Sequence, residues 1–174
     1  MKTLTLFAGL ALSSGCFGQG TVYFSTRVGA TVDAPVTYFG ELVDSRFLGQ
    51  LYVGAPNGNL APSGSGTPFR SDAGRGYITS GGLIEVPEIV AGEFAQVKLV
   101  VWAGSLGATY AEAVAKDVGG VGESSPITIR VGGGIIPPAT LEGLRGFEIS
   151  IPEPPSALLG CWGLGLLWTL KRRR

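Results

Sequence analysis

Glycine and proline interrupt this chain too often for long helices to form. The 174 residues include 29 glycines and 11 prolines, and glycine makes up about 17% of the chain against about 7% in an average protein. A glycine inside a helix costs about 1 kcal/mol relative to alanine, and a proline costs more. The composition therefore predicts a turn-rich, all-β domain of ordinary size.

Short β-type runs separated by turn residues recur about every ten residues. The clearest run covers 94–102 (FAQVKLVVW), where Val97, Leu99 and Val101 share one face. The opposite face is polar at its start and apolar at its end, which indicates partial cover by a neighbouring loop or sheet. Other predicted strands cover 21–26, 36–39, 47–53, 127–131 and 147–151, with a strand pair or one bulged strand at 77–86.

Two segments of the predicted domain lack a clear strand pattern. Residues 54–66 are rich in Gly, Pro, Asn and Ser and are predicted to form a loop, because they supply no apolar face. Residues 110–117 fit either a strand or one short helix with Ala111, Val114 and Ala115 facing inward. Seven to nine strands of this kind predict an antiparallel β-sandwich, immunoglobulin-like or jelly-roll.

The chain contains no histidine, and its two cysteines, Cys16 and Cys161, both lie in hydrophobic terminal segments. Between them there is no thiol or imidazole, which excludes Ser-His-Asp and Cys-His catalysis, imidazole metal sites and a core disulfide. Residues 19–151 hold eight basic and twelve acidic residues, a net charge of −4. A domain without a basic patch is not expected to bind nucleic acid.

The carboxylates of the domain are not arranged like those of a glycosidase, which needs two at a defined separation. Glu85, Glu88 and Glu93 are close in sequence but are expected to be solvated loop residues. We therefore predict no catalytic residue, no enzyme activity, no cofactor and no metal site. Bound calcium stays an alternative, although its candidate oxygen ligands form no dense loop. These ligands are Asp33, Asp44, Asn57, Asn59 and Asp72.

Several aromatic side chains offer a carbohydrate-binding alternative, because exposed rings can stack on sugars. The other interpretation is that they are core or edge residues of the sandwich. The set comprises Tyr23, Tyr38, Tyr52, Tyr77, Trp102 and Tyr110.

Residues 1–18 have the layout of a secretory signal peptide. A basic Lys2 precedes an apolar run at 4–12, and small residues follow. Signal peptidase cleavage between Gly18 and Gln19 is predicted. One alternative is a lipoprotein signal with Cys16 lipidated. Another is an uncleaved anchor, but the run is well short of the ~20 residues that a span needs.

The C-terminal segment, 152–174, has three parts in a fixed order. It opens with Pro152, Glu153 and Pro154, followed by Pro155, and continues with an uncharged hydrophobic segment at about 156–170. A helix over 157–170 reaches ~21 Å, short of the ~30 Å of a bilayer core. The residues expected to lie in the membrane are Ala157, Leu158, Leu159, Trp162, Leu164, Leu166, Leu167, Trp168 and Leu170.

The chain ends with a basic stop that is expected to stay cytoplasmic under the positive-inside rule, leaving the domain outside. Its residues are Lys171, Arg172, Arg173 and Arg174. A permanent tail anchor is the alternative to a processed signal.

This tripartite tail resembles the PEP-CTERM sorting signal of Gram-negative bacteria. The resemblance covers about 24 residues, with Pro155 where Ser or Thr is common and Cys161 within the apolar run. It implies that an exosortase-type transpeptidase of the inner membrane recognises Pro152, Glu153 and Pro154. The domain is also similar to short exported PEP-CTERM proteins of verrucomicrobial type, through its regions 20–24, 67–70 and 110–113.

The resemblance implies where the protein is located and how it is sorted, and implies no molecular activity for the domain. We expect an exported cell-envelope or extracellular-matrix protein, first anchored in the inner membrane and then surface-bound or secreted. A structural or interaction role linked to exopolysaccharide and biofilm follows from the family. The alternative is a carbohydrate-binding β-sandwich module.

Overall fold

The computed structural model describes residues 18–79 and 81–149. Within these ranges the chain forms eleven strands, one 3₁₀ helix and one short α-helix, so the all-β prediction is confirmed. The elements are β1 (Gln19–Tyr23), β2 (Arg27–Val28), β3 (Val32–Tyr38), β4 (Glu41–Leu42), β5 (Phe47–Gly54), β6 (Ala61–Pro68), β7 (Leu83–Val90), β8 (Phe94–Ala103), η1 (Gly104–Leu106), α1 (Tyr110–Ala115), β9 (Val121–Glu123), β10 (Ile127–Arg130) and β11 (Arg145–Glu148).

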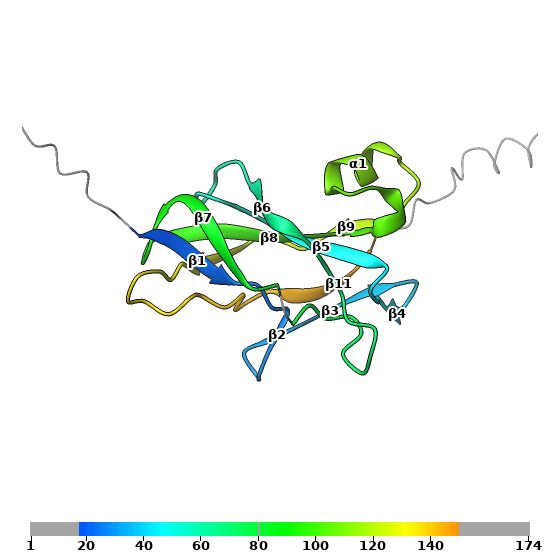
Figure 1. Ribbon diagram of the computed structural model, residues 1–174, viewed down its shortest axis with the longest axis horizontal. Helices are drawn as coiled ribbons and strands as arrows, with labels where there is room; N and C mark the ends of the chain where they lie inside the picture. The colour runs from blue at the N-terminus through cyan, green and yellow to red at the C-terminus, as the bar shows by residue number, and fades with distance from the viewer. Residues whose placement is uncertain (1–17, 80, 150–174) are drawn as a thin grey trace, which may run out of the picture.

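The larger sheet is built around β8 (Figure 1). Its order is β10–β8–β5–β6, and β9 pairs with β8 as well. All of these pairings are antiparallel. The predicted alternation of β8 is confirmed, because Leu99 and Val101 are buried in the main core. Val100 and Trp102 are buried on its opposite face.

The smaller sheet has the order β11–β3–β2, and β4 pairs with β3. Here the antiparallel prediction is only partly right, because β11 pairs with β3 in parallel. The chain returns to this sheet through the long segment after β10, so β11 runs in the same direction as β3. The ends of both strands therefore lie at the same edge of the sheet.

A two-stranded ribbon of β1 and β7 closes one side of the molecule. Thr21 N and Tyr23 N donate hydrogen bonds to Gly132 O and Ala139 O, at 2.8 and 2.7 Å. Strand β1 is therefore held between β7 and the segment that follows β10.

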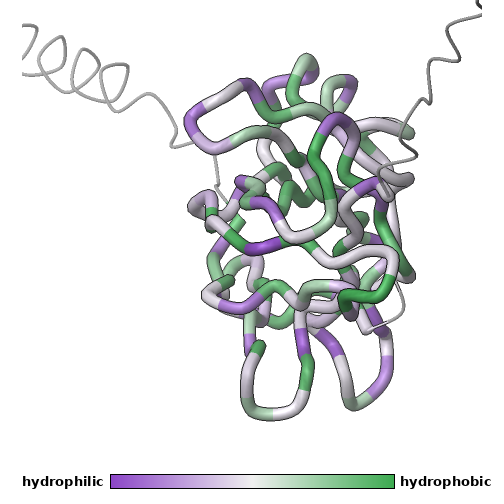
Figure 2. The backbone as a smooth tube through the Cα atoms, turned by 90° about the vertical axis from the view of Figure 1, so that its left-hand side faces the viewer, coloured by the Kyte–Doolittle hydropathy of each residue, from purple (hydrophilic) through white to green (hydrophobic). Residues whose placement is uncertain are grey.

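The main core lies between the five-stranded sheet around β8 and the four-stranded sheet around β3. Short hydrophobic stretches alternate with hydrophilic ones along the described chain, as Figure 2 shows, and the hydrophobic residues face inward. Burying one Val, Leu or Ile contributes about 1.5–3 kcal/mol. The core side chains of the facing strands are Val32, Ala34, Val36, Leu51, Val53, Val97, Leu99, Val101 and Ile129.

Helix α1 covers the outer face of β8. Thr109 caps its start, accepting a hydrogen bond from Glu112 N at 3.3 Å, and Glu112 Oε2 accepts one from Ala108 N at 2.8 Å. These bonds fix the helix phase so that Ala113 is buried with Trp102. The expected inward face was therefore wrong: Ala111, Val114 and Ala115 are exposed.

The predicted loop at 54–66 is wrong in its second half, which forms β6. Pro62 is tolerated because β6 is an edge strand, where a missing N–H breaks no second ladder. Gly64 has φ +70° at an irregular register, and Gly66 lies against the Trp102 ring. The segment pairs with β5 without carrying an apolar pattern of its own.

The strand pair predicted at 77–86 is also wrong in part, because residues 77–79 form no regular strand and β7 begins at Leu83. Gly81 instead lies against Phe24, whose carbonyl accepts a hydrogen bond from Gly81 N at 3.1 Å. The final strand, expected at 147–151, covers Arg145–Glu148.

Among residues 18–79 and 81–149, no helix has the length and hydropathy of a membrane span. The predicted hydrophobic segment at 156–170 lies outside the described residues.

Candidate functional site

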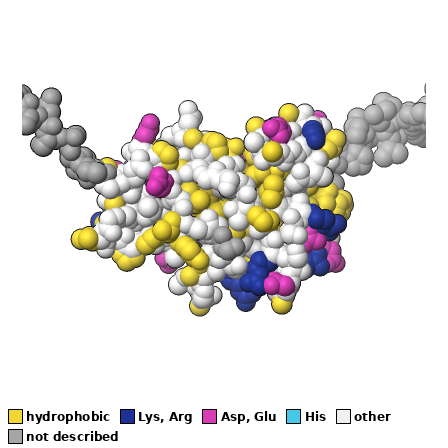
Figure 3. Space-filling view, viewed as in Figure 1, with side chains coloured by type: hydrophobic (Ala, Val, Ile, Leu, Met, Phe, Trp, Pro, Cys, Tyr) yellow, Lys and Arg dark blue, Asp and Glu magenta, His cyan; other side chains and the backbone are white. Residues whose placement is uncertain are grey.

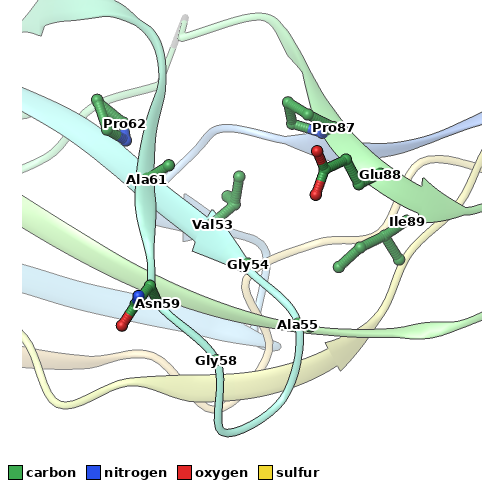
Figure 4. A pocket seen from close by; sticks show the side chains of 10 residues that line it. All are labelled: Val53, Gly54, Ala55, Gly58, Asn59, Ala61, Pro62, Pro87, Glu88 and Ile89. Atoms are coloured by element: carbon green, nitrogen blue, oxygen red, sulfur yellow. The ribbon is translucent and has the colours of Figure 1, made fainter.

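A pocket of about 410 Å³ opens between the β5–β6 turn and strand β7. In Figure 4, Pro62 and Pro87 stand on opposite sides of it, and the Glu88 carboxylate points from β7 toward Val53 and Ala61. Glu88 is the one ionisable side chain among the residues that line this pocket.

An irregularity in β7 produces this position of Glu88. Strand β1 pairs with β7 in register from Tyr23↔Leu83 to Gly20↔Val86, but its next pair is Gln19↔Val90. Residues 87–89 therefore have no partner on β1. Glu88 adopts φ 64°, a left-handed conformation that costs an ordinary residue about 1–2 kcal/mol. The bulge takes its side chain out of the strand alternation.

The opposite wall is a tightly folded turn. Gly54 lies so close to the Asn59 carbonyl that a Cβ would collide with it. Asn57 adopts φ 61°, which asparagine tolerates better than most residues. The turn therefore brings Asn59 to the edge of the pocket, where its position was not evident from the sequence.

The pocket holds one carboxylate among uncharged lining residues. Glycoside hydrolysis uses two carboxylates, and here Glu88 has no second ionisable group beside it among the lining residues. No group of three or more Cys, Asp or Glu side chains in the described part of the chain has metal-binding spacing. A single carboxylate between two prolines can accept hydrogen bonds from a hydroxyl or ammonium group.

The other acidic residues singled out from the sequence do not join Glu88. Glu85 is exposed on β7 opposite Thr21, and Glu93 lies in the turn before β8. Asp33 accepts a hydrogen bond from the Tyr77 hydroxyl at 2.7 Å. That bond raises the pKa of Tyr77, with a smaller contribution from burial.

Asp44 and Asp72 are each held by an arginine two residues away. Arg46 bonds Asp44 at 3.0 Å, and this lowers the pKa of the carboxyl. Arg70 does the same for Asp72, helped by the Gly74 amide, and lowers its pKa from 3.8 to about 2. Each of these two carboxylates is therefore engaged by an arginine of its own turn.

Most of the candidate sugar-stacking aromatics serve packing. Trp102 is completely buried, and its Nε1 donates to Gly107 O at 3.1 Å. Tyr110 packs edge-on against Trp102 and Tyr52, with centroids 6.2 and 6.1 Å apart, and desolvation raises its pKa. Tyr77 is covered by the Arg27 guanidinium at 4.9 Å.

A second hollow, of about 490 Å³, lies where β3 and β5 meet the end of β8. Tyr38 and Phe47 supply its rings, 5.4 Å apart and tilted by 58°. Arg46, Ser45 and Ser105 supply its polar groups. The rings are not coplanar, so they do not form a flat stacking platform.

Beside this hollow, β3 and β4 form a hairpin over residues 37–42, here called the exit hairpin. Its two-residue turn contains Phe39 at φ 54° and Gly40 at φ 72°, a type I′ geometry in which Asn-Gly is preferred. Phe39 is 62% exposed and Leu42 is 40% exposed. The sequence pattern gave no sign of an exposed, strained phenylalanine here.

The exit hairpin is bonded to the last described residues of the chain. Ile149 N donates to Thr37 O at 2.8 Å, and Gly40 N donates to Glu148 Oε1 at 3.0 Å. The chain therefore leaves the described domain directly beside Phe39. The start of β1 lies toward the other end of the long axis (Figure 1).

The predicted processing residues fall mostly outside the described ranges. Gly18 and Gln19 are described and exposed, and Gln19 begins β1. The sorting motif, the hydrophobic segment and the basic stop all follow residue 151 and lie outside the described residues.

No protein-family model, no curated protein and no solved structure matches this chain.

Proposed function

We propose that the chain is an exported cell-envelope or extracellular-matrix protein that reaches its place through a C-terminal PEP-CTERM sorting signal. Residues 1–18 act as the signal peptide, and residues 152–174 act as the sorting signal. An exosortase-type transpeptidase recognises Pro152, Glu153 and Pro154. The domain at 19–151 is non-enzymatic, and it has a structural or interaction role linked to exopolysaccharide and biofilm.

One observation carries this proposal. The described domain closes its core with β1 as its first strand and β11 as its last. The last described backbone bond, from Ile149 N to Thr37 O, comes three residues before Pro152. Both proposed processing segments therefore lie beyond the strands that build the core, so their removal would leave these strands complete. We interpret the two facing sheets as a β-sandwich of immunoglobulin-like or jelly-roll type.

Replacement of the motif tests the sorting signal. The variant Pro152→Ala/Glu153→Ala/Pro154→Ala keeps the chain length and the basic stop, and we expect it to accumulate in the inner membrane. The wild type should reach the outer envelope or the medium. Pro155→Ser, which restores the residue type common at that position, is the matched control and should fractionate like the wild type.

Identical fractionation of the wild type and the triple variant would reduce the motif to a hinge before a permanent anchor. A gene for an exosortase in the same genome supports the sorting route, and its absence counts against it. This observation needs no purified protein.

A carbohydrate-binding module is the second candidate, and the hollow beside Tyr38 favours it. There the half-buried Tyr38 ring lies near Arg46 and two serine hydroxyls, and a single ring with polar groups beside it can hold a sugar. Polysaccharide pull-down and a glycan array test it with Tyr38→Ala and Arg46→Ala variants. Binding that either substitution abolishes would support the module, and no binding to plant or bacterial glycans would count against it.

A further inference from the structure

The exit hairpin combines strain, exposure and position in one place. Phe39 has the φ of 54° that favours glycine or asparagine, and it exposes 62% of its surface. Leu42, on the neighbouring strand, exposes 40%. The Phe39 ring packs edge-on against Tyr38, with centroids 4.5 Å apart, and its exposed remainder is available for a contact outside the domain.

The parallel pairing of β11 with β3 fixes where this tip points. Strand β3 ends at Tyr38, and β11 ends at Glu148, with Glu148 opposite Thr37. Because the strands run in the same direction, the hairpin turn and the departing chain leave the sheet at the same edge. Gly40 N is bonded to Glu148 Oε1, so the tip and the exit are physically joined.

The distance from this exit to the proposed hydrophobic segment is short. Six residues, 150–155, separate Ile149 from residue 156, so seven extended steps span at most about 25 Å. When the segment is in the bilayer, Phe39 is therefore held close to the bilayer surface. At the high effective concentration that a short tether gives, even a weak contact is populated.

We propose that Phe39 and Leu42 of the exit hairpin insert into the lipid interface of the membrane that holds residues 156–170. Aromatic and aliphatic side chains favour the boundary between headgroups and acyl chains. The contact sets the domain upright on the membrane while the sorting signal is still attached. At this right-hand end of the molecule, Figure 3 shows several charged side chains beside a few hydrophobic ones.

This inference rests on the proposed function, since it needs residues 156–170 to be in the membrane. A second exposed apolar tip provides a matched control. Ile135 is fully exposed, and its loop lies at the other end of the molecule, where Gly133 contacts Gln19. We expect this tip to stay away from lipid, because no short connection to residues 156–170 holds it near the bilayer.

Site-specific photo-cross-linking tests the proposal in the full chain, reconstituted in vesicles of phosphatidylethanolamine and phosphatidylglycerol. Three separate variants carry the probe: Phe39→p-benzoylphenylalanine, Ile135→p-benzoylphenylalanine and Trp168→p-benzoylphenylalanine. Lipid adducts are counted by mass spectrometry, and circular dichroism checks that each variant is folded. We expect adducts at positions 39 and 168, and only background at 135.

The remaining outcomes distinguish the lipid contact of Phe39 from the membrane insertion of residues 156–170. Adducts at 168 without adducts at 39 overturn the lipid contact and leave the membrane segment intact. Equal yields at 39 and 135 overturn it as non-specific. Cross-links from 39 to a second protein chain overturn it in favour of self-association. No adduct at 168 overturns the membrane segment itself, and with it the proposed sorting route.

Discussion

The side chain of Glu148 accepts a hydrogen bond from the Gly40 amide at 3.0 Å, across 108 positions of sequence. This contact joins the last strand to the β3–β4 turn. It makes the exit of the chain and the exposed Phe39 parts of one surface.

Removing this contact should weaken the exit end. Glu148→Ala leaves the Gly40 amide without its partner, and we expect a loss of about 0.5–1 kcal/mol in the free energy of unfolding, because the site is exposed. Glu142→Ala, an exposed carboxylate on a turn, is the control and should change little. Urea denaturation measures both, and equal losses would contradict a specific role for Glu148.

Asparagine should destabilise the domain less than alanine at position 39, because the backbone there is left-handed. Phe39→Asn and Phe39→Ala both remove the ring, but asparagine tolerates φ 54° better. The free energy of unfolding of Phe39→Asn should therefore exceed that of Phe39→Ala by about 1 kcal/mol. The same two substitutions at Leu83, an exposed position in the regularly paired part of β7, should show no such preference. Thermal unfolding of the four variants is the measurement.

A glycine should stabilise the domain at position 88 and destabilise it at position 85. Glu88→Gly relieves the strain of φ 64° and should stabilise the domain by about 1 kcal/mol. Glu85→Gly lies on the same strand in regular pairing, where glycine should destabilise by about 0.5–1 kcal/mol. Denaturant unfolding compares the two, and a loss at position 88 would show that the carboxylate contributes to folding.

The approach of β6 to Trp102 leaves no room for a side chain at Gly66. An added Cβ would lie 2.8 Å from the Trp102 ring, so Gly66→Ala should cost about 1–3 kcal/mol. Adding Trp102→Phe removes the contacting ring atoms and should lower the cost of Gly66→Ala. A double-mutant cycle measures this coupling, and additive losses would contradict the contact.

The pKa of Asp72, lowered from 3.8 to about 2, predicts an acid-dependent contribution to stability. Because the folded-state pKa is lowered, the contribution is present above about pH 4 and is lost as pH falls through 2. Carboxyl NMR titration should give a midpoint near 2. In Arg70→Gln the midpoint should return toward 3.8, whereas the distant Arg130→Gln should leave it unchanged.

Sequence patterns predicted the strands that alternate apolar and polar residues, and missed those that do not. Residues 94–102 and 127–131 were placed well because their β-branched side chains define a face. Strand β6 was missed because its Gly, Pro and Ser residues have no apolar pattern and are held by pairing with β5. Glu88 was expected to be a solvated loop residue, and its position in a pocket depends on a bulge that no local signal reveals.

By itself, the sequence determined the all-β class, the absence of thiol and imidazole groups between Cys16 and Cys161, and the two hydrophobic ends. These are properties of composition and short-range order. Only the tertiary structure decided that β11 lies parallel to β3, that Phe39 stands beside the chain exit, and that Glu88 turns into a pocket. The physical reason is that strand pairing joins residues more than a hundred positions apart, and packing of the whole core selects the partners.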